Sequence, residues 1–198
     1  MVKRTIDFFA AFIGLIVLSP FFLIIAVLVK LDSRGPIFYL QNRVGLKGKL
    51  FQLFKFRSMK IEADKLAPIT IGQRDSRITP TGYFLRRFKI DELPQLINVL
   101  KGEMSLVGPR PEVEKFVKLY NPNQLRVLSV KPGITDYASI EFRNENRLLE
   151  GKPDPIEYYV TEIMPEKLRL NLKYIDSQSL FTDIQIILKT LFLIVSKK

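Results

Sequence analysis

The chain has 198 residues, a formal net charge of +11 and no cysteine or histidine. That length allows one good hydrophobic core, with room for an appendage. The missing residue types exclude disulfides, thiolate chemistry, Cys/His zinc sites and a histidine-based triad. Any catalysis must therefore rest on carboxylates, Lys, Tyr, Ser or Thr, or on a metal ion held by oxygen.

The positive charge is concentrated near the N-terminus. Residues 1–60 hold ten Lys or Arg against two Asp or Glu, a net +8, whereas residues 61–198 hold twenty-one against eighteen, a net +3. A nucleic-acid-binding protein more often spreads its excess over a groove or a recognition helix, and the chain has no zinc-finger or RNP-like motif. Basic residues that flank a membrane segment and face anionic lipid explain this distribution better, so we expect membrane lipid, and no nucleic acid, as a partner.

An apolar segment of 22 uncharged residues, 8–29, dominates the N-terminal part. A straight helix of this length is about 33 Å long, enough to cross a bilayer, and the run is too long for a signal peptide. Ser19-Pro20 lies at its middle, where the proline removes a hydrogen bond to Ile16 and the serine hydroxyl can satisfy the freed carbonyl. Basic residues flank both ends, which favours the cytoplasmic side for each. These residues alone leave open a kinked spanning helix and a re-entrant helix broken at Ser19-Pro20.

The next segments predict a hairpin followed by several short helices. Residues 37–40 and 50–56 are rich in β-type side chains on either side of a turn signal at 45–48. Residues 82–88 are typical of a short basic helix, and residues 91–101 place apolar side chains at helical spacing. Further helices are predicted over 111–120 and from 154 onward, with a turn at 131–133.

The C-terminal segment, 180–195, is strongly apolar and 16 residues long. That length is short for a transmembrane span, so the segment suits a buried helix or a helix that lies in the bilayer interface. Of these two we favour the interfacial helix.

Residues 91–111 carry the strongest functional signal. Two adjacent carboxylates, Asp91 and Glu92, stand at the start of a predicted helix. Acidic residues at this position are usually helix caps. A capping pair does not need Arg110, which stands between two prolines that limit its backbone freedom. Nor does a capping pair need the cluster of cations that precedes Asp91, namely Arg86, Arg87 and Lys89.

This combination of residue types suits phosphate chemistry. A carboxylate can act as a nucleophile and form a covalent intermediate, and a neighbouring carboxylate can hold Mg²⁺. Arginines bind phosphate oxygens and offset charge in the transition state. A non-catalytic, basic, membrane-anchored module remains an alternative, although it leaves the carboxylate pair and Arg110 unexplained. A nucleic-acid-binding protein would not need 22 apolar residues.

Six motifs along the chain form a recognisable set: Ser19-Pro20, Lys55-Phe-Arg-Ser-Met59, Asp75-Ser-Arg-Ile-Thr79, Asp91-Glu-Leu-Pro-Gln95, Asn98-Val-Leu-Lys-Gly-Glu-Met-Ser-Leu-Val-Gly-Pro-Arg-Pro111 and Lys131-Pro-Gly-Ile-Thr135. In these motifs nearly the whole chain resembles the bacterial sugar transferase family, the monotopic phosphoglycosyl transferases. The resemblance implies transfer of a sugar-1-phosphate from a UDP-sugar to a polyprenyl phosphate of the undecaprenyl type, with release of UMP. It implies a ping-pong mechanism through a phosphosugar-aspartyl intermediate, with Mg²⁺ as cofactor. The reaction would initiate glycoconjugate synthesis, as of a capsule, an exopolysaccharide, an O-antigen or a glycoprotein glycan.

The resemblance also completes the predicted architecture. It implies an α+β, mostly helical fold with a small β-hairpin. An anchor, 1–35, would be a re-entrant membrane helix broken at Ser19-Pro20. A compact catalytic domain, 36–198, would carry the interfacial C-terminal helix at the cytoplasmic face of the bacterial plasma membrane. Both termini would be cytoplasmic, and the chain is expected to be a minimal catalytic unit without the multi-span extension of larger members.

Carried over position by position, the resemblance implies Asp91 as the nucleophile. It implies Glu92 as the main Mg²⁺ ligand and Asp91 as a second ligand of the ion. Four arginines are implied as ligands of the substrate phosphates: Arg57, Arg86, Arg110 and Arg143. Many members continue the last motif with Gly-Trp-Ala-Gln, whereas this chain has Asp-Tyr-Ala-Ser at 136–139. Residues 136–147 therefore belong to a different branch, and the resemblance leaves the transferred sugar open.

Overall fold

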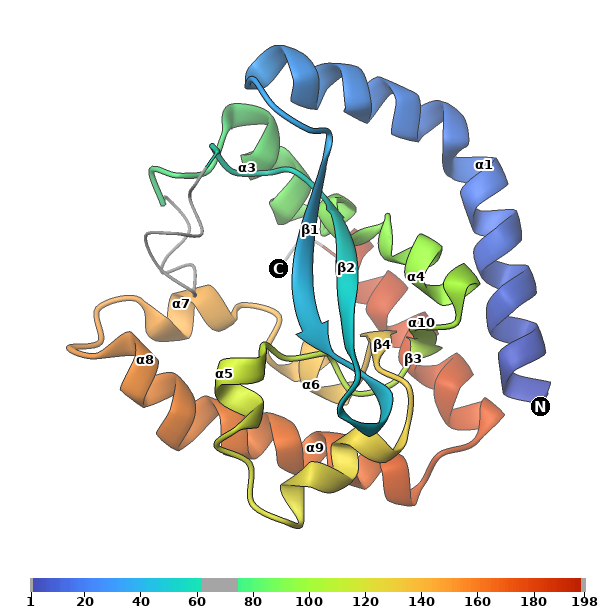
Figure 1. Ribbon diagram of the computed structural model, residues 1–198, viewed down its shortest axis with the longest axis vertical. Coiled ribbons are helices and arrows are strands. Elements are labelled where there is room, and N and C mark those ends of the chain that lie inside the picture. Colours follow the sequence, from blue (N-terminus) through green and yellow to red (C-terminus); the bar gives the residue numbers. More distant parts are fainter. Residues whose placement is uncertain (1, 62–74, 197–198) are drawn as a thin grey trace.

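The computed structural model describes residues 2–61 and 75–196, and Figure 1 shows their arrangement. A long N-terminal helix, α1 (Val2–Asp32), runs along the outside of a mostly helical body. The strands are β1 (Phe38–Val44), β2 (Leu50–Phe56), β3 (Ser105–Val107) and β4 (Gly133–Thr135). The other α-helices are α3 (Pro80–Arg87), α4 (Gln95–Lys101), α5 (Glu114–Val117), α6 (Tyr137–Glu141), α7 (Glu145–Leu149), α8 (Pro155–Tyr158), α9 (Met164–Asp176) and α10 (Leu180–Val195). The 3₁₀-helices are η1 (Leu46–Gly48), η2 (Ile90–Glu92) and the longer η3 (Gln124–Ser129), and η4 (Tyr159–Ile163) is a π-helical turn. The predicted α+β, mostly helical fold is confirmed.

Helix α1 is continuous and changes direction near its middle (Figure 1). Pro20 lies inside it, and the Ser19 hydroxyl donates to the Ile16 carbonyl at 2.8 Å. That carbonyl is the one that Pro20, lacking an amide hydrogen, leaves without its helical partner. The predicted break is therefore a bend within one helix, and the predicted role of Ser19 is confirmed.

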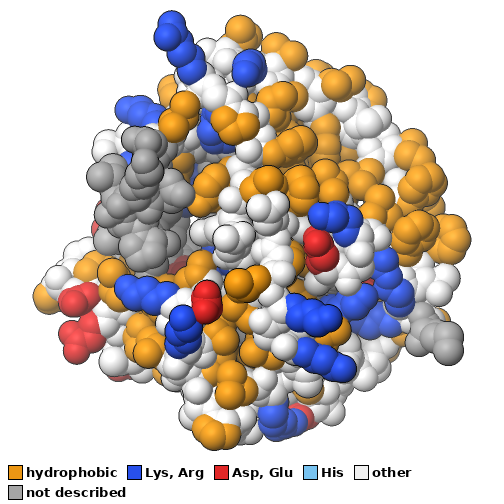
Figure 2. All heavy atoms as spheres, viewed as in Figure 1, with side chains coloured by type: hydrophobic (Ala, Val, Ile, Leu, Met, Phe, Trp, Pro, Cys, Tyr) orange, Lys and Arg blue, Asp and Glu red, His pale blue; other side chains and the backbone are white. Residues whose placement is uncertain are grey.

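Helix α1 exposes most of its apolar side chains. Among the described residues it is the one helix long and apolar enough to cross a membrane. Figure 2 shows hydrophobic side chains gathered along the edge of the molecule that α1 forms in Figure 1. Val17, Leu23 and Leu31 are 69%, 70% and 79% exposed. A continuous apolar surface of this kind is typical of a membrane helix, not of a helix that covers a soluble core.

Polar contacts fix the first turns of α1 to the body. The carboxylate of Asp7, which is 5% exposed, accepts from the Ser105 hydroxyl at 2.8 Å and from a backbone amide of β3 at 3.2 Å. Arg4 donates to the carbonyls of Val99 and Leu100 at 2.5 and 2.9 Å. These carbonyls lie in the last turn of α4, where regular helical bonding ends. The start of α1 is thus attached to two elements inside 91–111, the end of α4 and strand β3.

Strands β1 and β2 form the predicted antiparallel hairpin, with Phe38 opposite Phe56. Asn98 of α4 attaches its side-chain amide to the outer edge of β2 and is fully buried. The amide accepts from Phe54 N at 3.0 Å and donates to the Gln52 carbonyl at 2.7 Å. Because a buried amide needs such partners, this residue fixes how α4 sits against the strand.

A short parallel pair, β3 and β4, was not predicted; the sequence indicated only a turn at 131–133. Ser105 pairs with Gly133, and Val107 pairs with Thr135. The two chains cross closely just beyond β3, where a Cβ on Gly133 would meet the Gly108 backbone nitrogen at 2.1 Å. Only glycine allows this approach, which brings the segment around Arg110 against the one around 133.

We therefore expect Gly133→Ala to destabilise the fold by about 3 kcal/mol, because the added methyl overlaps backbone atoms that cannot move away independently. The control is Gly48→Ala in η1, where φ is +76° but no atom of the described residues lies within 4 Å of the new methyl. That change should cost only about 1 kcal/mol, from the left-handed backbone. Chemical denaturation of both variants measures the difference, and equal losses would contradict the close-approach argument.

Helix α10 has the predicted bounds, 180–195, and two different faces. Ile186 is fully buried against β3, and Asp183 accepts from the buried Tyr174 hydroxyl at 2.7 Å and pairs with Lys3 of α1. The opposite face exposes a stripe of large apolar side chains, Phe181, Ile184, Leu188, Leu191 and Phe192. A helix with one packed face and one exposed apolar face suits the predicted interfacial position.

Candidate active site

The carboxylate pair lies in η2, between α3 and α4. Lys89, the residue before the turn, has a left-handed backbone with φ 57°, and Pro94 precedes the first residue of α4. The single helix predicted over 91–101 is therefore a 3₁₀ turn followed by a shorter α-helix. Asp91 and Glu92 are only 5% and 9% exposed, so both carboxylates are buried at the junction.

Glu92 is held by two cations. Arg110 donates to both carboxylate oxygens, from Nη1 to Oε2 at 2.9 Å and from Nη2 to Oε1, and Lys55 Nζ lies 3.2 Å from Oε1. Burial alone would raise the pKa of Glu92, but Arg110 and Lys55 outweigh it and hold this pKa well below its usual range. Glu92 is therefore ionised at neutral pH.

Asp91 is in the opposite situation. Burial, and then the charge of Glu92, raise its pKa above the usual range, against the attraction of Lys55, Arg86 and Lys89. Its Oδ1 is buried without a hydrogen-bond partner among the described residues. A buried carboxylate oxygen without a partner is costly, and it calls for a ligand or a functional explanation. Of the two carboxylates, Asp91 is the one with an uncommitted oxygen.

The backbone of Arg110 is fixed from two sides. Its amide donates to Asp136 Oδ2 at 3.0 Å, and Asp136 also caps α6. On the other side, the amide of Val44, at the end of β1, donates to the Glu112 carbonyl at 2.9 Å, and Arg43 Nη1 donates to the Pro111 carbonyl at 3.1 Å. These contacts, with the two prolines, pre-organise Arg110 as the sequence predicted.

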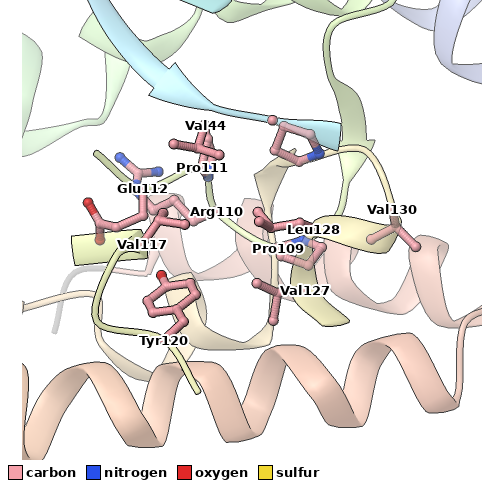
Figure 3. Close-up of a pocket in the computed structure, with 12 residues that line it drawn as sticks. Val44, Pro109, Arg110, Pro111, Glu112, Val117, Tyr120, Val127, Leu128 and Val130 are labelled. Carbon is pink, nitrogen blue, oxygen red and sulfur yellow. The ribbon is translucent and has the colours of Figure 1, made fainter. Parts of the chain in front are cut away.

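A small cavity of about 10 Å³ lies beside this loop (Figure 3). The charged groups of Arg110 and Glu112 lie at one side of it in Figure 3, and Val127 and Leu128 line the other. The carboxylate of Glu112 accepts from Arg43 at 2.9 Å and from the Tyr159 hydroxyl at 2.5 Å. The cavity has room for no more than about one water molecule, so it is too small to be a substrate pocket. The residues that line it support the loop.

Sequence reasoning missed Lys55 as a site residue, although it stood in one of the quoted motifs. A signal was present in the period of β2. Phe51 and Leu53 are buried on the inner face of the strand, and Lys55 falls on the same face by alternation. A lysine at an inward-facing position needs an anionic partner, and here the partner is Glu92.

Lys55 gives the site a pH dependence. Burial, opposed by Glu92, lowers the pKa of Lys55 to about 8, so its charge is present below that pH and is lost above it. We expect activity to fall as the pH rises through about 8, since the positive charge beside the dyad disappears. In Lys55→Arg the charge persists, so the alkaline limb of the pH profile of kcat/KM should move upward. Lys118→Arg, at an exposed pair with Glu114, should leave the limb in place; an unmoved limb in Lys55→Arg contradicts the assignment.

The other three predicted arginines lie in different places. Arg86, in the last turn of α3, is close enough to Asp91 to act on its charge. Arg57, 6% exposed, donates to the Ser33 carbonyl at 2.6 Å at the end of α1, and its Nε and Nη1 are buried without a partner among the described residues. Arg143 is half-buried between α6 and α7. In the described part of the chain, no hydrogen bond or ion pair joins Arg57 or Arg143 to the dyad.

The dyad offers donors that suit Mg²⁺. This ion prefers hard oxygen ligands and is often bound by one or two carboxylates together with water and substrate phosphates. Asp91 and Glu92 supply two adjacent carboxylates, and Asp91 Oδ1 is uncommitted. Over residues 2–61 and 75–196 no group of three or more acidic, His or Cys side chains forms a larger metal cluster. The residues therefore fit an ion that takes its remaining ligands from the substrate.

The sequence matches one family of proteins over nearly its whole length. Residues 1–197 match the family model described as bacterial sugar transferase. The chain belongs to the bacterial sugar transferase family, as the motifs predicted.

Several curated relatives carry more specific names. The UDP-glucose:undecaprenyl-phosphate glucose-1-phosphate transferase of Escherichia coli (strain K12) is 40% identical over 196 residues, 97% of this chain and 40% of that protein. The putative undecaprenyl-phosphate N-acetylgalactosaminyl 1-phosphate transferase of Bacillus subtilis (strain 168) is 47% identical over 119 residues, 60% of this chain and 66% of that protein. The exopolysaccharide production protein ExoY of Rhizobium meliloti (strain 1021) is 34% identical over 206 residues, 96% of this chain and 84% of that protein. The chain thus spans less than half of the Escherichia coli relative and most of ExoY.

Proposed function

We propose that this chain transfers a sugar-1-phosphate from a UDP-sugar to a polyprenyl phosphate of the undecaprenyl type and so initiates glycoconjugate synthesis. The observation that carries the proposal is the buried dyad, in which Asp91 keeps an uncommitted oxygen while Glu92 is held ionised by Arg110 and Lys55. The names of the relatives support the donor and acceptor classes. A non-catalytic anchor would have no use for two buried carboxylates gathered with two half-buried cations, because the desolvation of these charges is costly.

The proposed reaction has two half-reactions. An ionised Asp91 oxygen attacks the phosphorus that carries the sugar; the bond from this phosphorus to the bridging oxygen breaks, and UMP leaves with that oxygen. A phosphate oxygen of the polyprenyl phosphate then attacks the same phosphorus. The ester to Asp91 breaks, and a polyprenyl diphosphate sugar leaves.

The other residues stabilise charge in both steps. Arg110 presents a planar guanidinium on a fixed backbone and suits phosphate oxygens, while Arg86 adds positive charge beside Asp91. Mg²⁺, when bound at Asp91 and Glu92, would neutralise phosphate charge. We also propose that Arg57 and Arg143 contact substrate phosphates; for Arg57 the support is that two of its buried nitrogens have no hydrogen-bond partner among the described residues.

We further propose that the site faces the cytoplasmic surface of the plasma membrane. The bent apolar helix α1 enters the bilayer as a re-entrant anchor, and the exposed apolar stripe of α10 lies in the interface. This arrangement keeps the lipid tail of the acceptor in the bilayer and its phosphate at the surface, where a UDP-sugar arrives from the cytosol.

The topology can be tested by single-cysteine labelling, since the native chain has no cysteine. Val2→Cys and Lys60→Cys place a thiol at the first residue of α1 and after the hairpin. In sealed inverted vesicles both thiols should react with a membrane-impermeant maleimide, and in intact spheroplasts neither should. Reaction of the two positions from opposite sides would show a spanning helix and overturn the re-entrant assignment.

The transferase function is tested by a screen of nucleotide sugars. The purified chain is incubated with undecaprenyl phosphate, Mg²⁺ and each UDP-sugar in turn, and released UMP is measured. At least one UDP-sugar should release UMP and form a lipid-linked diphosphate sugar, and omission of the lipid should stop turnover. Absence of UMP release across the panel by a folded protein would contradict the proposed function.

A further inference from the structure

Glu92 and Arg110, which are proposed to bind different ligands, form an ion pair with each other. Glu92 is assigned to the metal ion and Arg110 to the substrate phosphate, yet they form a two-point ion pair in the structure. Lys55 occupies the same Glu92 oxygen that accepts from Arg110 Nη2. Both carboxylate oxygens of Glu92 therefore already accept hydrogen bonds, and Nη1 and Nη2 of Arg110 already donate to them.

This pair has consequences for binding because it is poorly exposed. The Glu92 side chain is 11% exposed and that of Arg110 is 29% exposed. A metal ion that takes Glu92 alone would leave Arg110 without its anion, and a phosphate that takes Arg110 alone would leave Glu92 with only Lys55. Leaving one charge of a buried pair uncompensated is strongly unfavourable. When the metal ion and the phosphate bind together, Glu92 exchanges Arg110 for the metal ion, and Arg110 exchanges Glu92 for the phosphate.

We propose that the Glu92–Arg110 pair is a latch that makes the binding of a divalent cation and of a diphosphate at this site mutually dependent. The proposal rests on the proposed function for the choice of ligands. The exchange needs side-chain movement only, because the Arg110 amide is held by Asp136 and the neighbouring Pro111 carbonyl by Arg43. The latch keeps Glu92 and Arg110 paired until cation and diphosphate bind together.

The proposal makes a quantitative prediction about coupling. Mn²⁺ binding, measured by electron paramagnetic resonance of the free ion, should be weak for the wild-type chain alone and tighter in the presence of UDP. By reciprocity, Mn²⁺ should tighten UDP binding by the same factor, roughly 5–150-fold for coupling of ordinary size. A direct bridge between the ion and the diphosphate would also couple them, so the variants decide.

Arg110→Gln removes the latch from one side. Glu92 then has lost its bidentate partner, so Mn²⁺ should bind this variant more tightly than the wild type without UDP, and the effect of UDP should shrink. Glu92→Gln is the reverse arm: UDP should bind it more tightly than the wild type without metal. Circular dichroism confirms that each variant is folded, and Arg110→Lys, which keeps the charge but not the two-point geometry, gives a second measurement for the first arm.

The matched control is Lys89→Gln. Lys89 is exposed and contributes positive charge at both Asp91 and Glu92, but no hydrogen bond joins it to either among the described residues. If metal binding responds only to net charge, Lys89→Gln and Arg110→Gln will tighten Mn²⁺ binding equally, and the latch is overturned. Unchanged Mn²⁺ affinity in Arg110→Gln overturns it as well. A larger gain in Arg110→Gln than in Lys89→Gln supports it.

The outcomes separate this proposal from the proposed function. If a UDP-sugar releases UMP but Arg110→Gln binds Mn²⁺ like the wild type, the transferase function stands and the latch falls. If no UDP-sugar releases UMP while Mn²⁺ and UDP stay coupled through Arg110, the latch stands and the transferase function falls.

Discussion

Asp91→Asn is expected to abolish transfer, lowering the rate of UMP release by roughly 10³-fold or more, as removal of a covalent nucleophile does in other enzymes. An amide has nearly the same shape as the carboxylate but does not form the phosphosugar ester. The variant should fold normally. Because burial raises the pKa of Asp91, its ionised form is disfavoured in the folded state, and a neutral side chain should leave the melting temperature unchanged or raise it.

The measurement pairs UMP release with thermal unfolding and membrane association. Asp154→Asn serves as the control: it is a conservative exchange at the cap of α8, where Asp154 accepts from two backbone amides at 2.9 Å. The control should retain full activity. Turnover near the wild-type rate in a folded Asp91→Asn variant would contradict the assignment of the nucleophile.

Glu92→Gln is expected to lower both stability and activity. Arg110 and Lys55, both half-buried, lose their shared buried anion, which should cost about 3 kcal/mol in the free energy of unfolding. Activity should fall by roughly 10²-fold or more, because the variant loses a charged group at the reacting phosphate. The matched control is Glu166→Gln, which breaks an exposed pair with Arg169 and should leave both properties unchanged.

The stability difference should depend on pH in a defined direction. The pKa of Glu92 lies well below its usual range, so the stability from its ionised form is fully present above the unfolded-state pKa of about 4.3. The gap between the wild type and Glu92→Gln should therefore be full at neutral pH and start to close only below about pH 4.3. A gap of the same size at every pH would show that the pair with Arg110 does not stabilise the fold.

The sequence predicted those helices and strands whose form depends on residues close together in the chain. The apolar run 8–29 predicted the central part of α1, which extends beyond it at both ends, and Pro20 predicted its bend. Residues of β type on either side of the turn signal at 45–48 predicted the hairpin, and the bounds of α10 agree at both ends. Each of these depends on the period of apolar residues or on a single proline, which the sequence contains directly.

The missed features depend on contacts between distant parts of the chain. The parallel pair β3–β4 has three-residue strands, and its register is set by the close approach of Gly108 and Gly133. The helix predicted over 111–120 is only α5, Glu114–Val117, because the chain before it is bonded to β1. No local pattern carries this information, since the partners lie far apart in sequence.

For the candidate site, too, the sequence predicted the residues that stand near one another in the chain but not the contacts between distant segments. The 91–111 motif identified Asp91, Glu92 and Arg110, because these residues lie close together in sequence. It did not reveal that Glu92 and Arg110 pair with each other or that Asp91 keeps a free oxygen, since both depend on how β2 and the 110 loop fold over η2. Arg57 shows the converse: it lies two residues after Lys55, just beyond the end of β2, but bonds to the segment that follows α1.

The proposed mechanism requires Asp91 to become covalently attached to the phosphosugar. It is tested most directly by incubating the wild-type chain with a UDP-sugar labelled at the sugar-bearing phosphate, in the presence of Mg²⁺ and without polyprenyl phosphate. We expect a burst of UMP stoichiometric with the protein, label on a peptide that contains Asp91, and release of the label when polyprenyl phosphate is added. Label on another residue, or UMP release that begins only once the lipid is added, would contradict it.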